Sequence, residues 1–218
     1  IDLRNGCNYF TIENITGKTE DDSIALTTLQ GSWHNKFVKG KDDDIHDVVI
    51  RNIQTDCLAC GNIRLTCADG NKVYNIVIDG VHDMAEKSCG YASGGTIKIN
   101  DSYYRYDRIS RLGEMYNISI NNVFSKSKVA AVMFQQTANN VTINNIFMEN
   151  PSAPAVLHHK GYGYLRDNNG PFDYDNVSIS NVFYSEPPKT EYAIDFRNCN
   201  AKNVRVGSVP DYIKSIIE

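Results

Sequence analysis

The chain of 218 residues is long enough for one domain with a sizeable core, and 41% of its residues are hydrophobic. Its formal net charge of −4 provides no general basic surface, which argues against nucleic acid as a partner. No apolar run approaches the roughly 18 residues of a membrane-spanning helix, so no membrane span is predicted.

A motif of alternating apolar residues recurs seven times along the chain. Each copy has a central β-branched residue, an apolar residue two positions before it and another three positions after it. Alternation with a period of two predicts a strand with one buried face. The central residues are Ile12, Ile50, Ile78, Ile120, Ile143, Ile179 and Val206, at spacings of 38, 28, 42, 23, 36 and 27 residues.

A second short strand is expected 12 to 19 residues after each of the first six centres. These second strands are centred on Ile24, Ile63, Ile97, Val132, Val156 and Ile194. Two strands in every repeat, all in one register, predict an all-β solenoid of stacked coils. We interpret residues 1–209 as a single-stranded parallel β-helix of about six to seven coils, and residues 210–218 as a C-terminal cap or tail. The chain opens in the form of a second strand, so we expect it to be the C-terminal part of a longer solenoid.

Asparagine recurs in two columns of the repeat. One column contains Asp47, Asn75, Asn117, Asn140, Asn176 and Asn203, and the other contains Asn14, Asn52, Asn122, Asn145 and Asn181. Asparagine tolerates the left-handed backbone conformation, and its amide can bond the residue one coil away. We therefore expect asparagine ladders. The N-x-S/T sequons in these columns are interpreted as by-products of the ladders.

Charged residues stand next to the second strands. Aligning the strand centres makes Arg64 and Lys98 neighbours on one outer face, about 4.8 Å apart, with Asp21 and Asp22 one coil beyond Arg64. Two like charges this close need a compensating anion. Two interpretations remain open, namely pairing with nearby carboxylates and a cleft that binds an acidic or polyhydroxylated chain.

Two long loops favour a cleft. Residues 27–46 include Trp33, and residues 100–114 include Tyr103, Tyr104 and Arg105. Long loops on a repeat scaffold tend to cluster on a functional face. Aromatic and arginine side chains suit contacts with sugar rings, but an oligomer interface uses the same residue types, so both roles remain open.

The six cysteines are consistent with an oxidising compartment. Cys57 and Cys60 form a lone CxxC, for which zinc binding or redox function is one interpretation and buried core thiols are the simpler one. No metal or cofactor is predicted.

The second strands and the residues before them resemble polygalacturonases and related members of glycoside hydrolase family 28. That family carries N-T-D, D-D before an I-A-L-like strand, G-H-G and R-I-K on successive coils. Here Asp21-Asp22-Ser23-Ile24-Ala25-Leu26 matches the D-D element. Cys60-Gly61-Asn62 stands at the G-H-G place without the histidine, and Thr96-Ile97-Lys98 matches R-I-K at its last two positions. The N-T-D aspartate would lie two residues before Ile1.

The resemblance implies a right-handed helix that hydrolyses a polysaccharide with inversion, using carboxyl groups about 6.5–9.5 Å apart. It implies Asp22 as the general acid and Asp21 as a residue that helps to activate water. It also implies that Lys98 binds a substrate carboxylate, with Arg64 replacing the lost arginine and Asn62 at the G-H-G place. A secreted or cell-surface location is expected for such a protein.

Two other classes remain open. A tailspike-like or adhesin β-helix would bind glycans, often as a trimer, with or without cleavage. A polysaccharide lyase of the same fold would use an acidic calcium site and a Lys or Arg base, and Asp21, Asp22, Arg64 and Lys98 suit those roles as well.

Overall fold

The structure is a computed structural model, and it describes residues 1–29, 43–86, 95–102, 108–159 and 171–217. All regular secondary structure within these residues is β-strand. The strands belong to two sheets in which neighbouring strands run parallel. No helix capable of spanning a membrane occurs in the described ranges.

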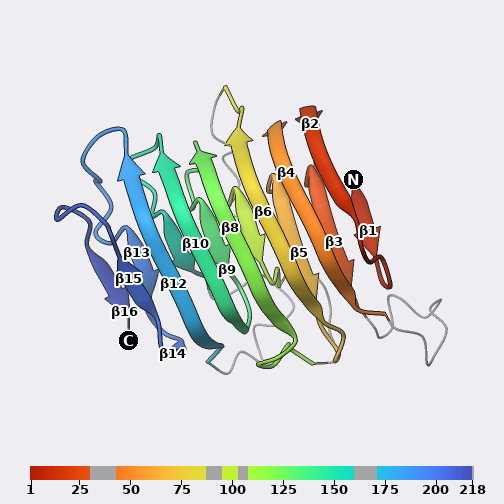
Figure 1. Cartoon of the computed structure of the whole chain (residues 1–218). Helices are drawn as coiled ribbons and strands as arrows, with labels where there is room; N and C mark the ends of the chain where they lie inside the picture. The colour runs from red at the N-terminus through yellow and green to blue at the C-terminus, as the bar shows by residue number, and fades with distance from the viewer. Residues whose placement is uncertain (30–42, 87–94, 103–107, 160–170, 218) are drawn as a thin grey trace.

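The chain alternates between the two sheets, which form two layers with the chain termini at opposite ends (Figure 1). Sheet A has the order β1 (Asp2–Arg4), β3 (Ile24–Thr28), β5 (Ile63–Cys67), β7 (Ile97–Ile99), β9 (Val132–Phe134), β11 (Val156–His158), β13 (Ile194–Phe196) and β16 (Ser215–Ile217). Sheet B has the order β2 (Thr11–Thr19), β4 (Ile45–Cys57), β6 (Val73–Asp83), β8 (Met115–Ser125), β10 (Ala138–Met148), β12 (Asp173–Tyr184) and β14 (Asn200–Lys202), and β15 (Arg205–Gly207) also pairs with β12. The predicted all-β, parallel architecture is confirmed, and its strand order is consistent with a β-helix or solenoid.

The predicted register holds in both sheets. In sheet B the paired central residues are Ile12, Ile50, Ile78, Ile120, Ile143, Ile179 and Val206. In sheet A they are Ile24, Ile63, Ile97, Val132, Val156 and Ile194. Apart from Val206, which is partly buried and packs against it, both rows belong to one hydrophobic cluster, and the residues of the middle repeats are fully buried. The alternation therefore arises because every second side chain of each strand lies in the shared core.

The last residues of the chain extend sheet A. Ser215–Ile217 forms β16, which pairs in parallel with β13, and Ile213 is buried. Residues 215–217 of the segment interpreted as a cap or tail thus form the last strand of sheet A.

The asparagine columns form ladders, as predicted. Their members adopt positive φ angles, for example 55° at Asn75 and 54° at Asn117. The first ladder is unbroken from Asp47 to Asn176: Asn75 donates to Asp47 (3.1 Å), Asn117 to Asn75 (3.1 Å), Asn140 to Asn117 (3.2 Å) and Asn176 to Asn140 (2.9 Å). Asn203, the last member of the column, donates to Asp175 instead. The second ladder is interrupted in β6, where Gly80 takes the left-handed position with a φ of 74°, and at Asn181, which donates to Asn144 and not to Asn145.

Candidate functional site

Four charged side chains meet on the outer side of sheet A. Arg64 and Lys98 are paired in register on β5 and β7, as predicted. Nε of Arg64 lies 2.9 Å from Oδ2 of Asp22, and Nζ of Lys98 lies 3.1 Å from Oδ1 of the same carboxylate. Asp101 completes the group, with its Oδ2 3.5 Å from Nζ of Lys98 and 3.8 Å from Nη1 of Arg64. We call these four residues the charge cluster.

The charge cluster is buried and electrically balanced. Its four side chains are 3% to 7% exposed, and two cations face two carboxylates. Burial lowers the pKa of Lys98, but Asp101 and Asp22 outweigh this effect and raise it above its ordinary value. Breaking such a buried pair on one side leaves an uncompensated charge, so the cluster behaves as a structural unit.

Gly61 packs directly against the charge cluster. Its backbone N–H donates to Oδ1 of Asp22 at 3.0 Å. A Cβ atom at this position would lie 2.7 Å from the carbonyl oxygen of Gly95 and 3.1 Å from Cε of Lys98. The backbone therefore reaches the buried carboxylate only because residue 61 has no side chain.

Asp21 lies beside the charge cluster but is exposed to solvent. Its Oδ1 accepts the backbone N–H of Asp22 at 2.8 Å, and its carbonyl oxygen accepts the Sγ–H of Cys57 at 3.4 Å. A hydrogen bond from Cys60 holds the pKa of Asp21 below its usual value, although partial burial opposes this effect. Asp21 is therefore an accessible anion at neutral pH.

Asn62 has a structural environment. It is 3% exposed, and its Nδ2 donates to the carbonyl oxygen of Thr55 at 2.7 Å and to the Thr55 hydroxyl at 2.9 Å. The adjoining cavity has a volume of about 10 Å³, which is room for no more than one water molecule. Among the described residues, this cavity is too small for a sugar ring.

The structure brings together Asp22, Arg64 and Lys98, and it leaves Asp21 at their margin. The sequence interpretation missed Asp101, although it left open that the two cations pair with nearby carboxylates. The position of Asp101, three residues after Lys98 and just beyond β7, was the available signal. Trp33, Tyr103, Tyr104 and Arg105 lie outside the described residues.

A metal ion has little to bind in the described part of this region. One ligand atom each from Asp21, Asp22 and Cys60 lies within 4.8 Å of the others. Both oxygens of Asp22, however, already contact a cationic side chain. A divalent cation would meet the positive charges of Arg64 and Lys98 at short range, which opposes its binding.

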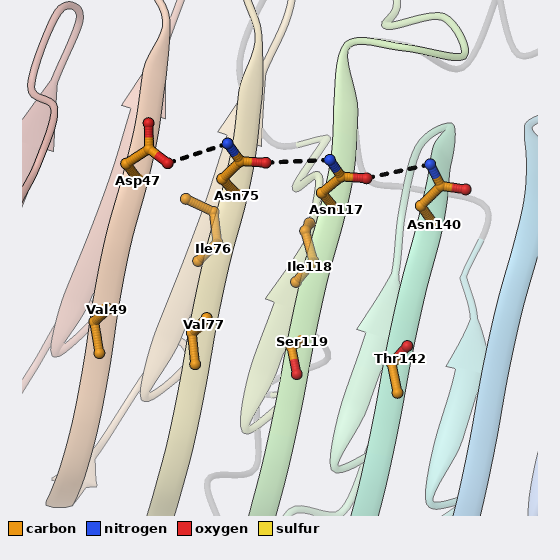
Figure 2. Close-up of a pocket in the computed structure, with 10 residues that line it drawn as sticks. All are labelled: Asp47, Val49, Asn75, Ile76, Val77, Asn117, Ile118, Ser119, Asn140 and Thr142. Atoms are coloured by element: carbon orange, nitrogen blue, oxygen red, sulfur yellow. Dashed lines mark hydrogen bonds between the residues drawn. The ribbon is translucent and has the colours of Figure 1, made fainter.

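A second candidate surface lies on the outer face of sheet B. A shallow groove of about 460 Å³ crosses four strands there, from β4 to β10. Figure 2 shows the first asparagine ladder along one side of this groove and a row of smaller side chains along the other. The lining residues are Asp47, Val49, Asn75, Ile76, Val77, Asn117, Ile118, Ser119, Asn140 and Thr142. We call this the sheet B groove.

A row of aromatic rings runs beside the asparagine ladder that lines the groove. The residues before the first three ladder positions are His46, Tyr74 and Tyr116, on successive strands. The rings stack in order, with centroids 4.8 Å apart for His46 and Tyr74 and 4.9 Å apart for Tyr74 and Tyr116. The strand register predicts this row, because paired residues on one face lie about one strand spacing apart. The sequence interpretation did not identify it.

A second aromatic row lies nearer the other end of the same strands. His82 stacks on Phe124 at 4.4 Å, and Phe124 packs on Phe147 at 5.5 Å. Phe183 is paired in register with Phe147. Phe124 and Phe183 are 44% and 45% exposed. The outer face of sheet B thus presents aromatic groups on both sides of the sheet B groove.

Comparisons with known proteins gave no match. None of the protein-family models matches the chain, and neither a curated protein nor a solved structure is significantly similar to it. Functional interpretation therefore depends on the geometry of the charge cluster and of the sheet B groove.

Proposed function

We propose that this protein is a right-handed parallel β-helix that binds a neutral polysaccharide in the sheet B groove. The right hand is supported by a general rule: connections between parallel strands of one sheet are almost always right-handed. The binding proposal is carried by one observation, the exposed groove that crosses successive strands between an amide ladder and a row of aliphatic and hydroxyl side chains (Figure 2).

The ladder amides have hydrogen-bonding capacity to spare. A primary amide offers two N–H donors and two acceptor lone pairs. Within the ladder Asn75 and Asn117 each donate once to the preceding repeat and accept once from the following one. Each can therefore offer one donor and one acceptor to a ligand. Sugar hydroxyls, which both donate and accept, match this pattern, and the repeat spacing of about 4.8 Å presents it periodically.

The charge of the groove favours an uncharged glycan. Asp47 is the single charged residue among those that line it. The cations that the family resemblance assigns to a substrate carboxylate, Arg64 and Lys98, lie on the other sheet and are neutralised by Asp22 and Asp101. An acidic chain such as a polyuronate would meet no unpaired cation in the groove. The glycan is therefore expected to be neutral.

The aromatic row lies next to the ladder residues that line the groove. Tyr74 and Tyr116 stack nearly parallel, with an interplanar angle of 5°, so their inner ring faces cover one another. Such amphipathic side chains are common at binding surfaces because they lose little conformational entropy.

Hydrolysis with Asp22 as proton donor and Asp21 as base is the second candidate, favoured by the juxtaposition of these carboxylates with two cations. A general acid must come within hydrogen-bond reach of the glycosidic oxygen. The Asp22 side chain is 3% exposed and lies between Arg64 and Lys98, which supports binding over hydrolysis. A polysaccharide lyase would also depend on these buried side chains. A tailspike-like trimer and a secreted location remain predictions.

Isothermal titration with soluble neutral and acidic oligosaccharides tests the proposal. Ser119 lies in the groove, so Ser119→Arg should weaken binding of a neutral oligosaccharide at least tenfold, about 1.4 kcal/mol. Ser152→Arg, at an exposed turn outside the groove, is the matched control. Release of reducing ends, measured in parallel, tests hydrolysis. Binding that survives Ser119→Arg would refute the groove assignment.

A further inference from the structure

The CxxC motif lies in the short segment that links β4 to the charge cluster. Cys57 is the last residue of β4, and Cys60 directly precedes Gly61. The backbone N–H of Cys60 donates to Sγ of Cys57 at 3.3 Å. The segment therefore folds so that the sulfur of the first cysteine lies against the backbone of the second. Neither cysteine forms a disulfide in this structure.

The two thiols converge on one residue. Sγ of Cys57 donates to the backbone carbonyl of Asp21 at 3.4 Å. Sγ of Cys60 lies within 4.8 Å of carboxylate oxygens of Asp21 and Asp22, and it is hydrogen-bonded to the Asp21 carboxylate. Both sulfurs therefore contact the same aspartate, Cys57 at its backbone carbonyl and Cys60 at its carboxylate.

We propose that Cys57 and Cys60 form a disulfide, and that its formation releases Asp21 from its thiol donors. This inference does not depend on the proposed glycan binding. The other described cysteines occupy separate places: Cys67 and Cys199 are buried in the core, and Cys7 lies near the N-terminal end of the sheets.

The reaction is a thiol–disulfide exchange with a small-molecule disulfide, such as oxidised glutathione, as the oxidant. Cys60, which is partly exposed, attacks first as its thiolate, forms a mixed disulfide and displaces one small thiolate. Cys57, which is 5% exposed, then attacks the sulfur of Cys60 and displaces the second. The two protein thiols lose two protons and two electrons, and the oxidant becomes two small thiols.

The environment of Cys60 predicts a slow reaction at neutral pH. Burial raises the pKa of Cys60 to about 12, although the charge of Lys98 opposes this shift. Only the thiolate is nucleophilic, so the rate should increase with pH in the range below 12. The raised pKa protects the pair from rapid oxidation but does not prevent a disulfide from forming at equilibrium.

The first test is equilibration of the full chain in glutathione redox buffers at pH 8, followed by alkylation and peptide mapping. We expect a Cys57–Cys60 disulfide, and free alkylatable Cys57 in Cys60→Ser. The control Cys199→Ser should form the bond as the wild type does. Alkylation of both cysteines after equilibration in oxidised buffer, or a disulfide from either one to another cysteine, would overturn the proposal.

The second test follows Asp21 itself by NMR titration of its carboxyl carbon in the reduced and oxidised forms. Loss of the Cys60 donor should raise the pKa of Asp21 towards its ordinary value in the oxidised form. Cys60→Ala, which removes the donor without oxidation, should produce a shift in the same direction. A pKa of Asp21 that is identical in both redox forms would refute the link between the thiol pair and this carboxylate.

Discussion

Nε of Arg64 lies 2.9 Å from Oδ2 of Asp22, and the two side chains are 7% and 3% exposed. This contact joins the segment just before β3 to β5 and, with Lys98 and Asp101, makes a buried cluster without net charge. Asp22 therefore has a structural role whether or not it also takes part in a reaction. A substitution that removes its charge leaves two buried cations facing one carboxylate.

Asp22→Asn should destabilise the fold by about 3–5 kcal/mol, because breaking a buried ion pair from one side leaves an unpaired charge. Urea unfolding monitored by circular dichroism measures the change. Asp2→Asn, which removes a carboxylate from an exposed pair with Arg4, is the control and should change stability by less than about 1 kcal/mol. The family resemblance predicts instead unchanged folding and lost turnover, so an Asp22→Asn protein of wild-type stability would favour the catalytic role.

Gly61→Ala tests the close approach of the backbone to the charge cluster. The added Cβ would lie 2.7 Å from the carbonyl oxygen of Gly95, and the resulting shift should cost about 1–3 kcal/mol. Gly207→Ala is the control, since no atom lies within 4 Å of the Cβ added there. Equal thermal midpoints for the two variants would contradict the packing described around Gly61.

Substitutions in the asparagine ladder can separate the effect of backbone conformation on stability from the effect of the side-chain hydrogen bonds. Asn117 has a φ of 54°, donates to Asn75 and accepts from Asn140. Asn117→Gly removes the side-chain bonds but suits the left-handed conformation, whereas Asn117→Ala also adds about 1–2 kcal/mol of backbone strain. The alanine variant should therefore unfold at lower urea concentration than the glycine variant. The reverse order would exclude a left-handed backbone at this residue.

The environment of His158 predicts that the fold loses stability in mild acid. Burial, with a smaller effect from His159, lowers the pKa of His158 to about 4, and its Nδ1 lies 2.9 Å from the Tyr174 hydroxyl. The unfolded chain, in which the pKa is ordinary, then binds the proton more readily than the folded chain. The stabilisation is complete above about pH 6.5 and is lost as the pH falls towards 4, by up to about 3 kcal/mol.

Urea midpoints between pH 7.5 and 4.5 measure this effect. The slope of stability against pH should be smaller in His158→Gln than in the wild type. His82→Gln, on the outer face of sheet B, is the control and should keep the wild-type slope. A wild-type slope in His158→Gln would show that another group controls the acid sensitivity.

The register was predictable because it depends on a local pattern. A strand with one buried face repeats every two residues, so the row that contains Ile50, Ile78 and Ile120 could be aligned from sequence. The ladders followed from the same alignment, since asparagine favours the conformation that each bend requires. The left-handed residue at Gly80 was not predicted, because glycine adopts this conformation without an asparagine in the column to signal it.

The candidate sites were less predictable, because burial depends on what covers a face. Alignment placed Arg64 beside Lys98, but period-two alternation treats every outward residue alike and assigns it to solvent. The structure buries both, with Asp101 as the additional partner. The stacked Tyr74 and Tyr116 could have been found by aligning the residue before each ladder asparagine.

The most direct test of glycan binding is backbone amide chemical-shift mapping of the full chain during titration with a neutral linear oligosaccharide that binds it. We expect the perturbed amides to cluster on the adjoining segments 47–49, 75–77, 117–119 and 140–142, which line the sheet B groove. Shifts centred on Asp21, Cys60 and Gly61, with the groove unperturbed, would contradict the account and return the binding site to the charge cluster.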